Sequence, residues 1–263
     1  MVWLRRMFFS CILISIMATL HARAEDKVWL SIGEFPPFFS STLSHYGVFP
    51  HIVEEAFAAE HIKVEYVFLP WNRALRMAAE GDYDGTPGWV YSKERAQQFS
   101  YSDPVLIETK VFFHLKSLNF DWSSIEDLKP YKIGLTLGYF YGPTLARAEV
   151  RDGFVFERVS TDLLNMRKLA AGRIQLFAVN REVGLQIARS EISAQDAANI
   201  TYHPKPISVD AQHLLISRNI DPVRARFLLD SFNRGLRKLR DSGRYETLWK
   251  EDIGVPFTPP PNP

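Results

Sequence analysis

The residues of this chain that are best suited to chemistry lie in the segment Pro70–Pro104, where Arg95 ends the sequence Ser92-Lys93-Glu94-Arg95. A guanidinium can form two parallel, charge-assisted hydrogen bonds with a planar carboxylate, and it never loses its charge. Such a side chain could hold a small anionic molecule. The alternative is a purely structural Glu94/Arg95 pair at the end of a helix.

The sequence contains no recognisable catalytic or metal-binding motif. We find no Ser-His-Asp order, no H-E-x-x-H spacing and no phosphate-binding glycine loop, and the seven histidines are scattered. Glu34, Glu182 and His114 are the candidate acids or bases, and they form no dyad. We therefore expect binding rather than catalysis, without catalytic residues, a cofactor or a metal.

The N-terminus has the pattern of a secretory signal peptide. Arg5 and Arg6 precede an apolar run at 7–20, and Ala22-Arg23-Ala24 forms an A-x-A cleavage site. The alternative is an uncleaved anchor, but the run is shorter than the roughly 20 residues that span a bilayer. We predict cleavage after Ala24 and a periplasmic protein. Cys11 is the only cysteine of the chain, so the mature protein would have no thiol.

The charge balance argues against nucleic-acid binding. The chain has 31 basic and 30 acidic residues, and removing the three arginines of the predicted signal peptide leaves 28 against 30. A mature chain with this slightly negative charge and no basic cluster cannot neutralise a phosphate backbone. We expect no nucleic-acid partner.

Periodicity predicts alternating strands and helices in two successive sets. The first set contains predicted strands at 28–32, 64–69 and 84–89 and helices at 47–59 and 71–79. The second contains a short helix with Ser123 and Glu126 as a capping box, strands at 132–137, 154–159 and 174–179, and a helix at 161–169 that begins at Thr161. Alternation implies parallel sheets. Because the pattern starts over, we predict two lobes rather than one continuous sheet.

The C-terminal part is predicted to be helical. Asp221-Pro222 is an N-cap followed by a first-turn proline, and Gly243 ends the helix. We predict a buried stripe made of Val223, Phe227, Phe232, Leu236 and Leu239. A second short helix follows at 245–249, and a proline-rich tail occupies 256–263.

The order of features in Pro70–Pro104 resembles the first lobe of bacterial extracytoplasmic solute-binding proteins of the amino-acid type, family 3. The segment reads PWNRALRMAAEGDYDGTPGWVYSKERAQQFSYSDP. The resemblance implies an α/β fold of the periplasmic-binding-protein type II, with two lobes that are each a mainly parallel sheet flanked by helices. It places lobe 1 at 25–110 and 209–255, lobe 2 at 111–208, and hinge crossings near 107–112 and 209–213.

The resemblance also implies a ligand site at the strand ends that face the cleft. Gly88 and Arg95 would hold a carboxylate, and Trp71 and Phe35 would contact the ligand. Some aromatic rings after the first strand, such as Phe38 and Phe39, could instead pack the lobe. The other residues that we expect at the ligand are Trp89, Gly138, Tyr139, Tyr141, Asn180, Arg73 and Glu34.

The sequence departs from the pattern of this family in three places, namely at Val90, at Asn180 and in the turn of Tyr139 and Tyr141. Val90 stands where amino-acid binders commonly have a hydroxyl, and Asn180 stands where many relatives have an aspartate that pairs with the ligand's ammonium. Tyr139 and Tyr141 replace a small, hydroxyl-rich turn. These departures weaken the expectation of an ordinary amino acid and favour a ligand with a flat or apolar body and one anionic end.

The resemblance implies a monomer that closes its lobes around a small molecule and presents it to a partner in the membrane. That partner would be the permease of an ABC transporter or a sensor kinase. Two alternatives stay open, namely a periplasmic enzyme on the same fold, such as a dehydratase, and a sensory or interaction module that has lost ligand binding.

Overall fold

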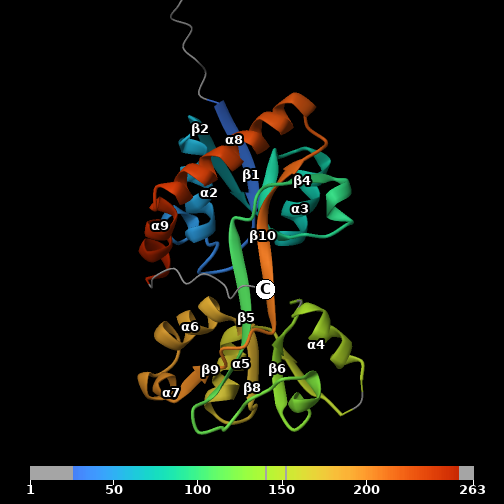
Figure 1. Cartoon of the computed structure of the whole chain (residues 1–263), viewed down its shortest axis with the longest axis vertical. Helices are drawn as coiled ribbons and strands as arrows, with labels where there is room; N and C mark the ends of the chain where they lie inside the picture. Colours follow the sequence, from blue (N-terminus) through green and yellow to red (C-terminus); the bar gives the residue numbers. More distant parts are fainter. Residues whose placement is uncertain (1–25, 140, 152, 255–263) are drawn as a thin grey trace, which may run out of the picture.

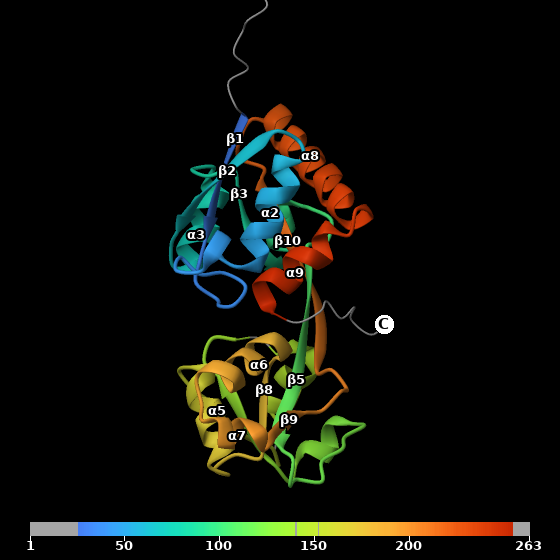
Figure 2. The same cartoon turned by 90° about the vertical axis from the view of Figure 1, so that its left-hand side faces the viewer.

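The structure is a computed structural model that describes residues 26–139, 141–151 and 153–254. The predicted signal peptide at 1–24 and the proline-rich tail at 256–263 lie outside the described residues. Figures 1 and 2 show two bodies, one above the other, connected by the two long strands β5 and β10.

Lobe 1 is the upper body in Figure 1. Its first elements are β1 (Asp26–Ile32), the 3-10 turn η1 (Ser44–Tyr46), α2 (Val48–Ala58), β2 (Ile62–Phe68), α3 (Trp71–Glu80), β3 (Gly85–Val90), the 3-10 turn η2 (Arg95–Gln97) and β4 (Phe99–Tyr101). It is completed by β10 (Ser208–Ser217), α8 (Pro222–Asp241) and α9 (Arg244–Ile253).

Lobe 2 is the lower body. It contains β5 (Leu106–Leu115), the 3-10 turn η3 (Ile125–Leu128), β6 (Lys132–Thr136), α4 (Gly142–Glu149), β7 (Val155–Val159), α5 (Asp162–Ala170), β8 (Leu176–Asn180), α6 (Arg181–Ser190), α7 (Ala194–Ala198) and β9 (Ile200–Tyr202). The sequence pattern did not predict the helices α4, α6 and α7.

Hydrogen bonding between strands runs without interruption from one lobe to the other. The strand order is β2-β1-β3-β10-β5-β8-β6-β7, with β4 on β10 and β9 on β5. The predicted fold of two lobes, each a mainly parallel sheet flanked by helices, is confirmed. That the sheets of the two lobes are joined and not separate was not predicted. The cause is the antiparallel pairing of β5 with β10, in which the five residues 208–212 lie opposite 106–110. Both predicted crossings fall inside these strands.

Helices cover both faces of the sheet, and the apolar face of α2 agrees with its prediction. Ile52, Val53, Ala56 and Phe57 are all fully buried. The predicted stripe of α8 was partly wrong, because Val223 is 78% exposed and Phe227 is 40% exposed. The buried face begins one position after Phe227 and consists of Leu228, Ser231, Phe232, Gly235, Leu236 and Leu239.

The predicted capping box before η3 is displaced by one residue. Ser124 is the N-cap and Asp127 the reciprocal partner, whose carboxylate accepts hydrogen bonds from the backbone of both Ser123 and Ser124 at 2.8 Å. These bonds lower the pKa of Asp127 to about 2.

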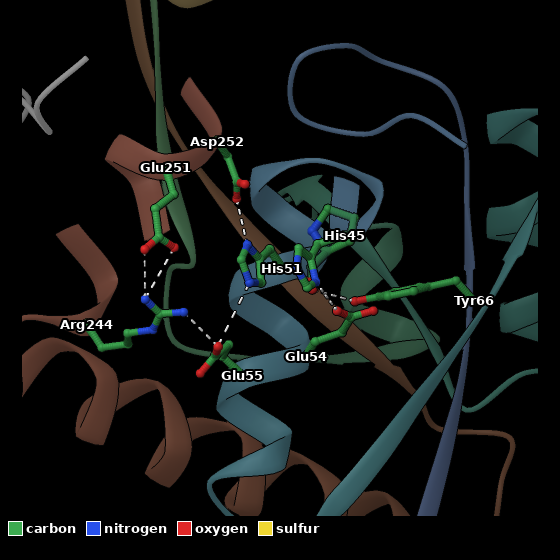
Figure 3. A network of polar contacts seen from close by, with 9 residues as sticks. His45, His51, Glu54, Glu55, Tyr66, Arg244, Glu251 and Asp252 are labelled. Carbon is green, nitrogen blue, oxygen red and sulfur yellow. Dashed lines mark hydrogen bonds and ion pairs between the residues drawn. The ribbon is translucent and has the colours of Figure 1, made fainter. Parts of the chain in front are cut away.

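A polar network attaches the last helix to the first helix of lobe 1 (Figure 3). The imidazole of His51 on α2 contacts Asp252 on α9 at 2.9 Å, and Arg244 donates to Glu55 at 2.9 Å. Arg244 also bonds Glu251 on its own helix. Polar contacts at both ends of α9 therefore hold it against α2.

Candidate functional site

A cavity of about 640 Å³ lies between the lobes. Lobe 1 contributes Phe35, Phe39, Trp71, Asn72, Gly88, Trp89, Val90, Tyr91, Ser92 and Arg95 to its wall. The crossing strands contribute Glu108, Lys110, Asp210 and Gln212, and lobe 2 contributes Gly138 and Tyr139. A larger hollow of about 860 Å³ lies on lobe 1 between α2, β2 and α8. Its lysine and arginine side chains are all paired, Arg234 and Lys238 with Glu60 and Lys63 with Glu65.

Seven of the predicted ligand residues meet on the wall of the cavity between the lobes. They are Arg95, Gly88, Trp71, Phe35, Trp89, Gly138 and Tyr139. The first five come from lobe 1 and the last two from lobe 2, so the cavity depends on both lobes. That these residues bind a ligand stays a prediction.

The guanidinium of Arg95 is held in place by two contacts. One terminal nitrogen donates to the carbonyl oxygen of Val90 at 2.6 Å, and the group lies 5.3 Å from the ring centre of Trp89. Within the described residues, Arg95 forms no ion pair within 4 Å, and its buried Nε has no hydrogen-bond partner. The alternative, a structural ion pair of Arg95 with Glu94, is not formed within 4 Å, and Glu94 accepts a hydrogen bond from Ser92 at 2.8 Å. A positioned cation with unused donors can receive an anion.

Aromatic rings form much of the wall. The indole of Trp71 stands edge-on to Phe39 at 5.2 Å and to Trp89 at 5.5 Å, and its Nε1 donates to the carbonyl of Glu34 at 3.0 Å. These contacts fix the ring as part of a rigid apolar surface. Phe39, which sequence reasoning left between a core and a cleft role, is 1% exposed and yet contributes to the wall.

Gly88 is required by its conformation and by its surroundings. Its φ is +89°, in the region that favours glycine, and a Cβ at this position would lie 2.6 Å from Cζ of Phe39. A side chain here would push the Phe39 ring out of place. Because Gly88 has no side chain, its backbone can pack directly against the Phe39 ring on the cavity wall.

The lobes touch at two points, one on the wall of the cavity and one between α6 and α9, whose residues do not line the cavity. The rings of Phe35 and Tyr139 meet edge to face at 5.9 Å, and Arg189 on α6 donates to the carbonyl of Ile253 at the end of α9 at 3.4 Å. Burial, followed by the negative charge of Asp162, raises the pKa of the Tyr139 phenol. Tyr139 is therefore neutral at physiological pH and can serve as a hydrogen-bond donor.

Four predicted residues do not lie on the wall. Tyr141 is buried in lobe 2, where its oxygen accepts from the backbone of Thr136 at 2.7 Å and burial raises its pKa to about 12. Asn180 is the N-cap of α6, and its Oδ1 accepts hydrogen bonds from the backbone N–H groups of residues 182 and 183. Arg73 is exposed on α3, and Glu34 accepts from the backbone of Ser41.

The residues that sequence reasoning weighed for catalysis do not gather either. Glu182 bonds Arg181 at 2.7 Å, and His114 bonds the carbonyl of Leu115 while burial lowers its pKa. Neither side chain contributes to the cavity wall. Among residues 26–139, 141–151 and 153–254, no three His, Cys, Asp or Glu side chains are grouped to hold a metal ion.

Sequence reasoning missed the four polar residues of the crossing strands. Glu108 and Lys110 alternate on β5, and Asp210 and Gln212 alternate on β10. Alternate residues of a strand point to the same face, so charged or amide side chains two residues apart on each strand were the available signal. It was overlooked because these segments were treated as connections.

Residues 29–251 match the sequence profile of the bacterial extracellular solute-binding proteins, family 3. The chain belongs to this family. A comparison with curated proteins finds no match. No helix in the described part of the chain is both long and apolar enough to cross a membrane.

Solved structures confirm that this family member has the periplasmic-binding-protein fold. It is similar to substrate binding domain 2 of GlnP from Lactococcus lactis in the open conformation (19% identity, 89% of this chain and 98% of that chain, TM-score 0.68). It is also similar to a histidine kinase sensor domain (21% identity, 90% and 100%, TM-score 0.67). A third is the GluR0 ligand-binding core from Nostoc punctiforme in complex with L-glutamate (16% identity, 85% and 98%, TM-score 0.64).

Proposed function

We propose that this family member captures a small carboxylate-bearing solute in the cavity between its lobes and presents it to a membrane transporter. The observation that carries the proposal is the arrangement of Arg95, whose guanidinium lies on the cavity wall without a carboxylate partner in the described residues. Trp71 and Trp89 would enclose the body of the solute, while Arg95 holds its anionic end.

Binding would favour the closed arrangement of the lobes. A solute that touches Arg95 on lobe 1 and Tyr139 on lobe 2 makes both contacts only when the lobes are close, so it shifts the population toward closure. β5 and β10 are the strands about which the lobes would move. The closed shape is the signal that a membrane permease could recognise.

A melting experiment on residues 25–263 tests this proposal. The twenty standard amino acids, their aromatic derivatives and small aromatic carboxylates are screened for a shift in melting temperature. At a hundredfold excess over Kd, a ligand adds about 2.7 kcal/mol of stability, or roughly 5–10 °C. We expect Arg95→Ala to abolish the shift of the best carboxylate.

Arg76→Ala is the matched control, because Arg76 is an exposed arginine of lobe 1 that is paired with Glu80. It should retain the full shift. An Arg95→Ala protein that folds and binds the carboxylate as tightly as the wild type would refute the anchor.

A ligand-sensing role for a membrane kinase is the second candidate, and the similarity to a histidine kinase sensor domain favours it. Deleting the gene separates the two roles. Loss of uptake of the identified solute supports transport, whereas intact uptake with a lost transcriptional response to that solute supports sensing. Consumption of the ligand during the melting assay, measured by chromatography, would instead favour an enzyme.

A further inference from the structure

The crossing strands place charged side chains on the wall of the cavity, at its hinge side. Glu108 and Lys110 come from β5, and Asp210 comes from β10, where it lies directly opposite Glu108 in the antiparallel register. Glu108 is 8% exposed and Lys110 is 7% exposed. Glu108 and Lys110 have therefore largely lost their contact with water, while the side chain of Asp210 stays 22% exposed.

Two carboxylates in this group share a single ammonium. Nζ of Lys110 lies 3.0 Å from Oε1 of Glu108 and 3.3 Å from Oδ2 of Asp210. The remaining bonds are neutral, because Gln212 donates to the second oxygen of Glu108 at 2.7 Å and Ser208 donates to Asp210 at 2.9 Å. The group thus carries one negative charge in excess.

No other cation of the described chain compensates this charge. Arg95 lies on the same cavity wall but has no carboxylate within 4 Å in the described residues. Asn180 is paired with Lys110 across β5 and β8, and its neutral amide cannot supply a charge of either sign. Burying an uncompensated carboxylate is costly, so closure of the cavity favours a ligand that brings a positive charge to this point.

We propose that Glu108 and Asp210 form the subsite for a positively charged group of the solute. The inference rests on the proposed function, since it adds a second charged contact to the site that contains Arg95. The solute is then a zwitterion, whose carboxylate is held by lobe 1 and whose ammonium or similar cation is held by the two crossing strands. Among described residues no third metal-ligating side chain joins these carboxylates, and Lys110 lies between them, which disfavours a metal ion.

The location gives the subsite a direct role in closure. β5 and β10 are the strands that run from one lobe into the other, and the two acids are on adjacent strands at that crossing. A cation bound to both acids holds the pair of strands in one arrangement. Recognition of the positive end of the solute is thereby coupled to the position of the lobes.

The first test needs no variant. Residues 25–263 are titrated calorimetrically with the twenty standard amino acids and with the N-acetyl derivative of each, which keeps the carboxylate and side chain but loses the ammonium. We expect at least one free amino acid to bind and its N-acetyl derivative to bind about 30-fold more weakly or worse. Equal binding of the two forms overturns the subsite and leaves the proposed function intact. If neither form of any amino acid nor any small carboxylate binds, the proposed function fails and the subsite with it.

The second test uses variants with opposite expected effects. Glu108→Gln should reduce the preference for the free amino acid over its N-acetyl derivative at least tenfold, because it removes the excess negative charge. Lys110→Gln should increase that preference, because it leaves both acids uncompensated. If the group had a purely structural role, each variant would bind the free amino acid and its N-acetyl derivative more weakly by the same factor. That result would overturn the inference.

Glu149→Gln is the control for the loss of an acid, since Glu149 is paired with Arg158 on lobe 2 and does not contribute to the cavity. It should leave the preference unchanged. If Glu108→Gln does not fold, the comparison of N-acetyl and free amino acids on the wild type still decides the question.

Discussion

At the scale of single residues, the site depends on how Arg95 is prepared for an anion. Its bond to the carbonyl of Val90 and its contact with Trp89 restrain the side chain before any ligand arrives. Val90 replaces the hydroxyl expected from the family pattern, but its backbone oxygen orients the guanidinium. A restrained cation loses less conformational entropy on binding than a free one, which favours affinity.

The geometry predicts that a lysine cannot replace this arginine. Arg95→Lys keeps the positive charge but loses the forked donors and the bond pattern to Val90, so affinity for the best carboxylate should fall about 10- to 100-fold. Isothermal titration calorimetry measures the change. If Arg95→Lys binds as well as the wild type, a point charge suffices, and the prediction of a bidentate contact between Arg95 and the carboxylate is wrong.

Gly88→Ala should destabilise the protein and impair binding together. The left-handed backbone and the contact with Phe39 together predict a loss of about 2–4 kcal/mol in the free energy of unfolding. Gly243→Ala provides the control, because Gly243 also has a positive φ, +74°, but a Cβ there would meet nothing within 4 Å. Denaturant unfolding should show a smaller loss for Gly243→Ala, and equal losses would mean that the contact with Phe39 has no energetic effect.

At the scale of elements, local capping signals predicted where α5 and α8 begin. Thr161 accepts from the backbone of Leu164, and Asp221 accepts from that of Arg224, as their positions indicated. α6 was missed because its N-cap, Asn180, was interpreted as a ligand residue. A side chain after a buried strand can serve the next helix or the cleft, and the sequence alone does not separate these two roles.

The network around α2 predicts an unusual effect of pH (Figure 3). Burial raises the pKa of Glu54, although its contact with His45 at 3.4 Å opposes the shift. A carboxyl whose pKa is raised on folding stabilises the fold below its unfolded value of 4.5, and this stabilisation is lost as the pH rises through the folded value. Glu54→Gln should therefore raise the melting temperature at pH 7, with the difference vanishing below about pH 4.

Glu55→Gln is the matched control for this prediction, because Glu55 is the neighbouring acid but is bonded to Arg244 at 2.9 Å. It should give no stabilisation at pH 7. A melting temperature of Glu54→Gln at or below that of the wild type would show that the contact with His45 outweighs the cost of burial.

At the scale of the whole molecule, the ends of the predicted strands indicated the position of the cavity correctly. The segments that connect the two lobes were predicted less well. Gly88 lies near the end of β3 and Arg95 follows that strand, while Gly138 and Tyr139 follow β6, so the general rule for open sheets brought both sets to one cleft. β5 and β10 were expected as crossings, yet they pair with each other and join the lobes into one sheet. Long-range strand pairing leaves no local pattern in the sequence, and the charges on those strands went unused.

The distance between the lobes, with and without solute, tests the central claim most directly. Residues 25–263 contain no cysteine, so spin labels can be placed at Val150→Cys on lobe 2 and Val223→Cys on lobe 1, which are 87% and 78% exposed. With the amino acid or carboxylate that gives the largest melting shift, we expect the distribution of distances measured by pulsed electron paramagnetic resonance to shift and narrow. The same solute should leave the distribution unchanged in the Arg95→Ala protein. A wild-type distribution that is identical with and without saturating solute would contradict closure of the lobes around a ligand.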